Sequence, residues 1–270
     1  MWSSVSGRQH KMDLIKTYFG FSNKFLLANL VQKNLKVRYR RSALGYFWTI
    51  LVPLATSLIY VFFFTVIFQI KSQNFTVQIV TCVLTWSLFS VSLSQGLASI
   101  TSNKTILSRV NVPINIFALA NTFSNFITLL LSLPVILTAC WYFEVPLGLN
   151  SLWYFYFISA LALISYPIGL LFGVALIYAK DIQQLLNPLL QLWLYITPIL
   201  FTPSRVPEAY KWALYINPTG MIFSGIQTSL LNNQSPGSGE VFIPILWCLI
   251  LNATCLTLVK NHSKLALESM

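Results

Sequence analysis

The chain has 270 residues, of which 56% are hydrophobic and only 9% are charged, and its formal net charge at neutral pH is +11. An average soluble domain carries about 25% charged residues, so this composition excludes an ordinary water-soluble fold. Together with a mean hydropathy of +0.70, it predicts an all-α integral membrane protein in which the few charges separate the membrane crossings.

The first 41 residues are polar and basic and lack the apolar stretch of a secretory signal peptide, so we expect them to stay in the cytoplasm. Apolar side chains recur there at every fourth position: Leu27, Val31, Leu35 and Tyr39. Basic side chains follow at spacings of three and four: Lys33, Lys36 and Arg40. This pattern predicts an amphipathic helix that lies along the inner leaflet instead of crossing it.

A basic cluster leads directly into the first uncharged stretch, in the sequence VRYRRSALGYFWTILVPL at residues 37–54. Arg38, Arg40 and Arg41 have two interpretations. They anchor the chain on anionic lipid, or they bind a phosphate-bearing substrate head group at the membrane surface, because guanidinium groups suit bidentate phosphate contact. Gly45 then allows a sharp backbone turn into the first crossing.

Six uncharged stretches approach or exceed the roughly 20 residues that a helix needs to cross a bilayer: 46–69, 77–97, 114–142, 152–178, 182–201 and 241–259. A seventh stretch, 212–239, is interrupted by Asn217-Pro218 and predicts a re-entrant or interfacial helical pair. Six crossings place both termini on one side, which then holds 14 of the 17 Lys and Arg residues. Such a bias indicates the cytoplasmic side.

The predicted organisation has three parts: a cytoplasmic tail with the interface helix at 1–43, a six-helix domain at 44–260 and a second cytoplasmic tail at 261–270. Two segments of the domain lie outside the membrane, an inner loop at 99–113 and an extracytoplasmic segment at 205–240. The inner loop is polar and carries Lys104 and Arg109, and the chain restarts as a helix at Pro113. This loop is either a docking surface for a cytoplasmic partner or a plain solvated loop.

Catalytic side chains are scarce. The six acids lie at termini or segment boundaries, and both histidines lie in the tails, so no pair suits general acid and base catalysis. No ionisable group falls inside a predicted crossing, which disfavours an ion-coupled carrier. No phosphate-binding loop of the GxxxxGK[ST] type is present, so a partner must handle any ATP. The four cysteines show no metal-ligand spacing and are predicted to be packing residues.

Aromatic residues are abundant, with 8 Trp, 12 Tyr and 20 Phe. They suit lipid-facing surfaces and interfacial belts, but aromatic faces also bind the C–H faces of sugars. A neutral aromatic conduit could therefore pass a long hydrophilic chain without holding any one unit tightly. Both interpretations stay open for the rings on the first and fifth crossings: Tyr60, Phe63, Phe64, Trp193 and Tyr195.

The order of these features resembles the ABC-2 type permeases that export polysaccharides, especially the membrane subunit of O-antigen exporters and its relatives for teichoic acid and capsule. The resemblance runs from about residue 30 to residue 231. It is carried by short motifs along the chain: Leu44-Gly45 with Trp48 and Pro53, Val112-Pro113, Lys180-Asp181, Thr197-Pro198, Val206-Pro207-Glu208 and Asn217-Pro218. Lys33-Asn34 and Lys180-Asp181 depart from it, because relatives commonly have Arg-Asp at both places.

The resemblance implies the ABC-2 (type V exporter) fold and a homodimer in the bacterial inner membrane that pairs with two copies of a separate ATPase. That partner would bind ATP and Mg, and this chain would bind no cofactor. Four basic residues would contact the ATPase: Lys33, Lys36, Lys104 and Arg109. Leu44 and Gly45 would form a cytoplasmic gate, and Pro207, Asn217 and Pro218 an outer gate. The cargo would be a glycan on a polyprenyl pyrophosphate, exported for lipopolysaccharide biosynthesis.

Two alternatives remain from the sequence. An ABC-2 exporter of another cargo, such as a small lipid or drug, would share the architecture but would not need the arginine cluster. A membrane-embedded glycosyl or lipid transferase belongs to another class, and it is disfavoured because acids are missing from plausible active positions. A transferase would act without a partner, whereas an exporter subunit would be inactive without its ATPase.

Overall fold

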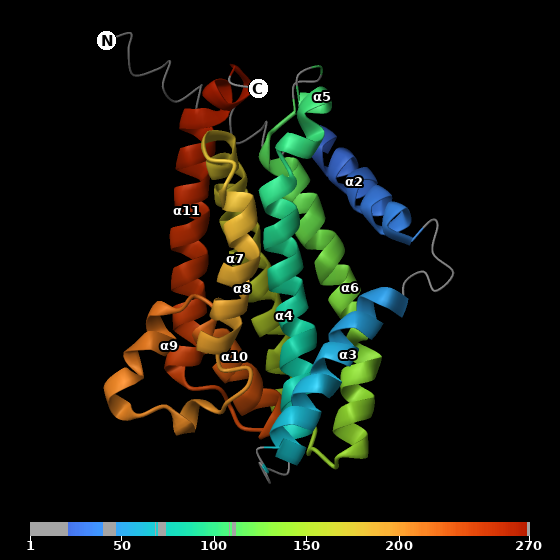
Figure 1. Cartoon of the computed structure of the whole chain (residues 1–270), viewed down its shortest axis with the longest axis vertical. Helices are drawn as coiled ribbons and strands as arrows, with labels where there is room; N and C mark the ends of the chain where they lie inside the picture. The colour runs from blue at the N-terminus through green and yellow to red at the C-terminus, as the bar shows by residue number, and fades with distance from the viewer. Residues whose placement is uncertain are drawn as a thin grey trace.

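The computed structural model describes residues 21–39, 47–67, 69, 74–107, 109 and 112–268, and every regular element in these ranges is helical. The long helices run between the two ends of the molecule (Figure 1). In chain order they are α2 (Phe21–Tyr39), α3 (Phe47–Phe62), α4 (Phe75–Ala98), α6 (Asn115–Tyr142), α7 (Trp153–Tyr178), α8 (Ile182–Ile196) and α11 (Ser238–Glu268). The predicted all-α architecture is confirmed.

Short elements connect these helices. A π-helical turn, η1 (Phe63–Ile67), extends α3, and η2 (Thr101–Asn103) and α5 (Lys104–Leu107) form the inner loop. Further elements lie at the opposite end of the molecule: η3 (Leu149–Leu152), η4 (Pro203–Arg205), η5 (Glu208–Tyr210), α9 (Trp212–Ile216), α10 (Gly220–Ile226) and the π-helical η6 (Gln227–Leu231). The α9–α10 pair turns at Asn217-Pro218, where the sequence predicted a break.

Five of the six predicted crossings correspond to helical stretches that are long and apolar enough to span a membrane: Ile50–Ile67, Phe75–Ala98, Asn115–Tyr142, Leu149–Tyr178 and Ser238–Leu258. The sixth candidate, α8, has 15 residues, which gives a length of about 23 Å against a hydrocarbon core of about 30 Å. It ends at Ile196 because Thr197 takes an extended conformation before Pro198. The helix is thus shorter than the predicted range, and the sixth crossing stays a prediction.

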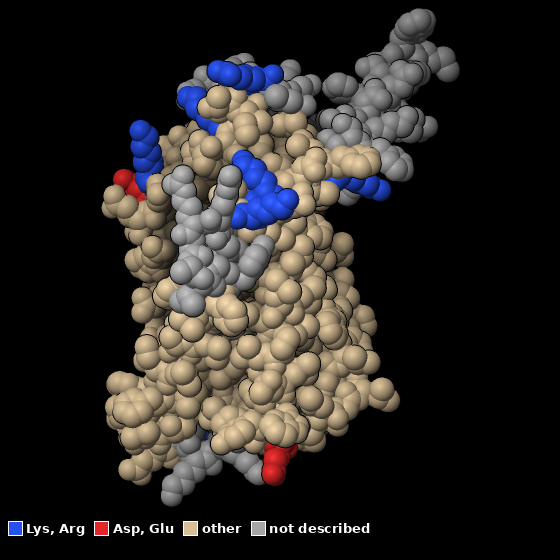
Figure 2. All heavy atoms as spheres, turned by 90° about the vertical axis from the view of Figure 1, so that its right-hand side faces the viewer, with Lys and Arg blue, Asp and Glu red and all other residues tan. Residues whose placement is uncertain are grey.

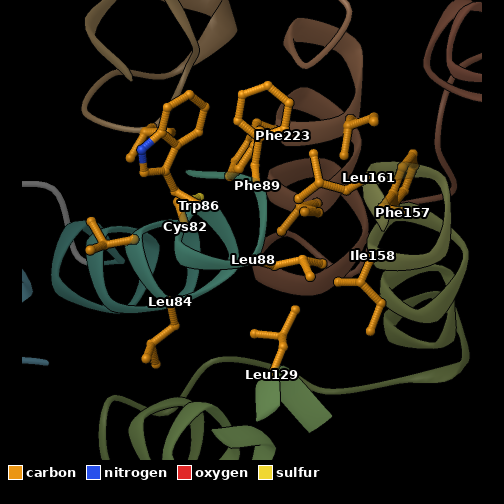
Figure 3. Packing of buried hydrophobic residues seen from close by; sticks show 14 of the residues in the cluster. Cys82, Leu84, Trp86, Leu88, Phe89, Leu129, Phe157, Ile158, Leu161 and Phe223 are labelled. Carbon is orange, nitrogen blue, oxygen red and sulfur yellow. The ribbon is translucent and has the colours of Figure 1, made fainter. Parts of the chain in front are cut away.

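The helix α4 forms the centre of the bundle, with α6 and α7 packed against it. Its side chains are almost entirely apolar or small, so it can be covered on all sides. Figure 3 shows Trp86 and Phe89 of α4 beside Phe223 of α10, with Phe157 of α7 close by. The Trp86 ring centroid lies 5.0 Å from that of Phe89 and 6.1 Å from that of Phe223. These rings join the bundle to the α9–α10 pair.

The helix α3 is peripheral. It crosses the front of the bundle diagonally (Figure 1), and only 6% of its membrane-spanning stretch is buried, compared with 78% for α4. The helix α2 packs against the inner end of α6, where Leu26, Leu27 and Leu30 contact a cluster that includes Phe117. Only Leu27 of this contact belongs to the predicted apolar stripe. The side chains of Lys24, Lys33 and Lys36 are exposed, and the predicted position of α2 along the inner leaflet stays a prediction.

Lys and Arg gather at one end of the molecule, around α2, α5 and the α7–α8 turn (Figure 2). Among the described residues, the exposed basic side chains at this end are Lys24, Lys33, Lys36, Lys104, Arg109 and Lys180. The opposite end carries α9 and α10 (Figure 1). By the bias of basic residues toward the cytoplasm, we call the basic end the inner end and the opposite end the outer end.

Candidate transport pathway and outer segment

The predicted entrance residues fall largely outside the described part of the chain. Arg40, Arg41, Leu44 and Gly45 lie in the undescribed stretch between α2 and α3. Arg38 belongs to the last turn of α2, but its side chain is not among the described ones. The roles predicted for these residues stay predictions.

The five predicted channel aromatics divide into three groups. The side chains of Tyr60 on α3 and Tyr195 on α8 lie close enough to interact, and Phe63 is exposed on the surface. Phe64 packs instead at 5.7 Å, between ring centroids, from Phe75 of α4. Trp193 likewise packs at 5.0 Å from Phe89 of α4. The structure therefore brings Tyr60 and Tyr195 together, turns Phe64 and Trp193 toward the bundle and leaves Phe63 on the surface.

The short helix α8 has three different faces. Its protein-facing side consists of Leu186, Leu190 and Leu194, which are buried. A second, exposed face is apolar: Leu185, Leu189, Leu192 and Ile196. A third face is exposed and polar: Gln184, Asn187, Gln191 and Tyr195. We call this third set the α8 polar stripe.

The α8 polar stripe has a direct energetic consequence. Transfer of an amide from water to hydrocarbon without a hydrogen-bond partner costs roughly 2–7 kcal/mol of free energy per group. Three amides on one helical face therefore require water or polar protein groups beside them. The spacing of Gln184, Asn187 and Gln191, at i, i+3 and i+7, is visible in the sequence. Sequence reasoning missed this face because it searched for charges and aromatic rings.

The outer segment is held by a buried hydrogen-bond network centred on Asn217. Its Oδ1 atom accepts from Trp193 Nε1 at 2.9 Å, from Thr219 N at 3.0 Å and from Thr219 Oγ1 at 2.8 Å. Its Nδ2 atom donates to Thr197 Oγ1 at 3.0 Å. Asn217 thus fixes the turn between α9 and α10 against the end of α8. Trp193 is part of this network as well as a predicted channel aromatic.

Two glutamines hold the turn that follows α8. Gln78 Nε2 on α4 donates to the carbonyl oxygens of Ile199 and Phe201 at 3.1 and 3.2 Å. Gln227 Nε2 on η6 donates to the carbonyl oxygens of Pro198 and Phe201 at 2.5 and 3.2 Å. These amides satisfy backbone carbonyl groups that lie outside the regular helices and have no partner within them.

The predicted outer-gate residues differ in burial. Asn217 is buried, Pro218 is half-buried and Pro207 is exposed at the start of η5.

The carboxylate of Glu240 is a third anchor of the outer segment. It is buried near the start of α11 and accepts three hydrogen bonds, from Ser224 Oγ at 2.6 Å, Thr228 Oγ1 at 2.9 Å and Gly237 N at 3.0 Å. The contact to Gly237 follows the pattern of a helix cap in which an acid in the first turn reaches back to a free N–H. The sequence placed Glu240 at a boundary, but gave no sign that it is buried.

Replacing Glu240 with alanine should lower the free energy of unfolding by about 2 kcal/mol, because the buried Ser224 hydroxyl and the Gly237 N–H lose their acceptor. Thr228 Oγ1 keeps the Ser224 carbonyl oxygen at 3.1 Å. Thermal unfolding of the purified chain, followed by size-exclusion chromatography, measures this change. The matched control is Glu208→Ala at the same end. Glu208 is exposed and paired with Lys211, so its removal should cost less than about 1 kcal/mol. Equal effects of the two substitutions would contradict the anchoring role.

At the inner end, side-chain amides connect α2, α6 and α4. Asn34 Nδ2 donates to Asn121 Oδ1 at 2.8 Å, and Asn121 Nδ2 donates to the Gln95 carbonyl oxygen at 3.2 Å. One turn further along α6, Asn125 Nδ2 donates to Ser92 Oγ at 3.0 Å and to Gln95 Oε1 at 3.2 Å. Asn34 is one of the two departures from the resemblance. Here Asn34 connects the interface helix α2 to the bundle through a hydrogen bond between two uncharged amides.

The predicted ATPase contacts are exposed at the inner end. Lys33 and Lys36 project from α2, Lys104 lies in α5 and Arg109 follows it. Lys33 and Lys36 thus share α2, whereas Lys104 and Arg109 lie in or after α5. Figure 2 shows Lys and Arg gathered at this end of the molecule. Among the described residues, no group of three or more His, Cys, Asp or Glu could hold a metal ion.

The helical membrane body, the basic interface helix and the broken outer helical pair together define a transporter of the ABC-2 type. The chain belongs to the ABC-2 type transporter family, whose pattern matches residues 26–231. Among curated proteins, it is 28% identical to the O-antigen export system permease protein RfbA of Klebsiella pneumoniae over 201 residues, which cover 74% of this chain and 78% of the relative.

Two further relatives extend this comparison. The O-antigen export system permease protein RfbA of Myxococcus xanthus is 29% identical over 234 residues, which cover 82% of this chain and 88% of the relative. The polysialic acid transport protein KpsM of Escherichia coli is 27% identical over 203 residues, which cover 72% of this chain and 77% of the relative.

Proposed function

We propose that the chain is the permease subunit of an ATP-driven exporter that moves a lipid-linked polysaccharide of the O-antigen type outward across the inner membrane. The α8 polar stripe is the observation that carries this proposal, because exposed amides on a membrane helix need water, a polar cargo or polar protein groups beside them. The printed names of the relatives support the cargo class. KpsM also supports a capsule-type polysaccharide as the second candidate cargo.

The proposed assembly is a homodimer with two ATPase subunits at the basic inner end. Nucleotide binding falls to the partner, because the sequence has no phosphate-binding loop. The contacts proposed for the ATPase are Lys33, Lys36, Lys104 and Arg109. In this assembly both termini lie in the cytoplasm.

Co-purification tests the assembly. The tagged chain is isolated from its native cells in mild detergent, bound proteins are identified, and ATP hydrolysis is measured. Recovery of a nucleotide-binding subunit in equal proportion, together with loss of surface polysaccharide in cells that lack this chain, is the expected result. Recovery of the chain alone with transferase activity would contradict the proposal.

The α8 polar stripe should face an aqueous path. In a variant whose four native cysteines are replaced by serine or alanine, Gln191→Cys should react with a membrane-impermeant thiol reagent at least about tenfold faster than Leu249→Cys on α11. The reason is that only hydrated thiols ionise and react readily, and Leu249 is an exposed apolar residue that would face lipid. Mass spectrometry of the complex in lipid nanodiscs measures the labelling. Equal labelling at both positions would contradict an aqueous stripe.

We further propose that Arg38, Arg40 and Arg41 bind the phosphate groups of the cargo lipid. Replacing all three with glutamine should reduce export at least about tenfold while the complex still assembles, because neutral amides cannot form the bidentate charged contact. Surface polysaccharide and co-purified ATPase report the two effects separately. Unchanged export in this triple variant would leave only the anchoring interpretation.

A further inference from the structure

A cavity of about 260 Å³ lies between the inner half of α3 and the helices α4 and α6. Trp48 and Val52 of α3 form one wall, Leu88, Val91 and Gln95 of α4 form another, and Asn125 of α6 completes the lining. The α8 polar stripe does not contribute to it. The cavity therefore differs from the path proposed for the polysaccharide.

The inner part of this cavity carries hydrogen-bond donors. Gln95 Oε1 accepts from Asn125 Nδ2 at 3.2 Å, which fixes the orientation of the Gln95 side chain. Among the described groups, the Gln95 NH₂ group finds no acceptor. An amide with unused N–H groups in an otherwise apolar membrane cavity calls for a ligand with oxygen acceptors.

The rest of the cavity is mostly apolar and is elongated along the helix axes. The residues that line it on α4 lie between Ser87 and Gln95. These two residues are eight steps apart, which span about 12 Å at 1.5 Å per residue. Val52, Leu88 and Val91 supply apolar surface along this length. Gln95 lies at the inner end of α4, which ends at Ala98. The two amides thus lie at the end toward the inner surface. At the other end, the Ser87 hydroxyl already donates to the Leu84 carbonyl oxygen at 2.6 Å.

Charge at the inner end is complementary to an anionic head group. The hydrogen bond between Asn34 and Asn121 places α2 beside the helix that lines the cavity. Lys33 and Lys36, on either side of Asn34, are exposed. The described parts of α2, α3, α4 and α6 contain no acidic residue. An anionic lipid at this surface would therefore meet positive charge without a competing carboxylate on these helices.

We propose that this cavity binds the lipid end of the cargo, a polyprenyl chain with the phosphate group that is attached to it. The first part of the prenyl chain lies along Val52, Leu88 and Val91. Oxygen atoms of the head group accept hydrogen bonds from Gln95 Nε2 beneath the lysines of α2. The proposal rests on the proposed function, which supplies a lipid-linked cargo. A single-chain lipid fits a cavity of this volume and length better than a diacyl phospholipid, which brings two chains.

Photocrosslinking tests the site. The full chain is purified from its native cells together with whatever binds it, placed in nanodiscs, and exposed to a C55 polyprenyl phosphate that carries a benzophenone group. We expect crosslinked peptides from the cavity walls on α3 and α4. Unlabelled polyprenyl phosphate should compete for the site, whereas phosphatidylglycerol at the same concentration should not.

Two variants and one control define the site. Val91→Trp should reduce crosslinking at least about tenfold, because the indole occupies the apolar part of the cavity. Gln95→Leu should weaken it about three- to tenfold, the effect of one lost hydrogen bond. The control is Leu163→Trp, which adds the same ring at a half-exposed position in a separate cavity between α6 and α7. It should leave crosslinking unchanged, and size-exclusion chromatography checks that all three variants fold.

Three results would overturn the inference: crosslinks that map away from α3 and α4, equal competition by phosphatidylglycerol, or full crosslinking in Val91→Trp. Export in cells is measured separately. If the wild-type chain supports polysaccharide export but any of these results is obtained, the site is wrong and the proposed function stands. If deletion of the chain leaves surface polysaccharide unchanged, the proposed function is wrong whatever the crosslinks show.

Discussion

Replacing Gly96 with leucine is expected to prevent accumulation of the folded protein. A Cβ atom on Gly96 would lie 2.7 Å from the Cα atom and 2.8 Å from the carbonyl carbon of Gly169, and both of these are backbone atoms that cannot rotate away. Membrane helices that meet through small residues pack backbone against backbone, and here α4 and α7 do so in the centre of the bundle. A leucine would force these helices apart, at a cost of about 3 kcal/mol or more.

Fluorescence-detected size-exclusion chromatography across a temperature series measures this effect on the tagged chain. Gly96→Ala should lower the melting temperature, and Gly96→Leu should leave little monodisperse protein. The control is Gly237→Ala, where a Cβ would meet no atom within 4 Å. It should cost less than about 1 kcal/mol even though Gly237 precedes a helix. A normal elution profile for Gly96→Leu would mean that α4 and α7 do not touch at this point.

The contact at Gly96 also shows which part of the packing could have been predicted from the sequence. Gly169 and Gly173 form a GxxxG pattern on α7, which is typical of close helix contacts in membranes. That signal was available in the uncharged stretch, although it does not name the partner helix. Gly96 stands alone on α4, so only the three-dimensional arrangement pairs it with Gly169.

The crossings themselves were predictable because charge is so rare in this chain. Each long interval without charge from residue 114 to residue 178 became a helix, since apolar side chains and the need to satisfy backbone polar groups leave no other solution in lipid. The end of α8 was not predicted. The sequence Thr197-Pro198 carries a signal for it, because a residue before proline disfavours the α conformation. The absence of charge up to Ser204 favours a longer helix instead.

Hydrogen bonds between polar side chains of distant segments could not be predicted from the sequence. Gln78 and the carbonyl group of Ile199 are 121 positions apart in the chain, and no local pattern relates them. Glu240 was correctly placed beside the last crossing, yet burial of its carboxylate depends on Ser224 and Thr228 folding back over it. A buried acid can be predicted only when the groups that solvate it are known.

The aromatic predictions show a related limit. The side chains of Tyr60 on α3 and Tyr195 on α8 interact, while Trp193 packs on Phe89. Ring type and position in the sequence are similar in these cases, and the direction of each side chain depends on the rotation of the helix about its axis. The Trp193 side chain points into the protein because its indole N–H needs a hydrogen-bond acceptor there, and Asn217 Oδ1 supplies one.

Asn217→Leu is expected to abolish export while ATP hydrolysis by the associated partner continues. Asn217 is buried, and its amide joins Trp193 of α8, Thr197 after α8 and Thr219 before α10. Leucine has a similar size but can neither accept nor donate. The Thr219 N–H therefore loses its acceptor, and the Trp193 indole keeps only the longer contact of 3.2 Å to Thr219 Oγ1. Leaving such groups unsatisfied should lower the free energy of unfolding by about 3 kcal/mol.

The measurement combines surface polysaccharide in cells with ATP hydrolysis and thermal unfolding of the purified complex. The control is Asn232→Leu, because Asn232 is an exposed asparagine at the same end of the molecule. It should change the free energy of unfolding by about 0.5 kcal/mol or less and leave export normal. If Asn217→Leu lost stability but exported normally at low temperature, the network would only support the fold. Loss of export at a temperature where the variant remains folded requires that α8 and the outer segment be held together for the cargo to leave.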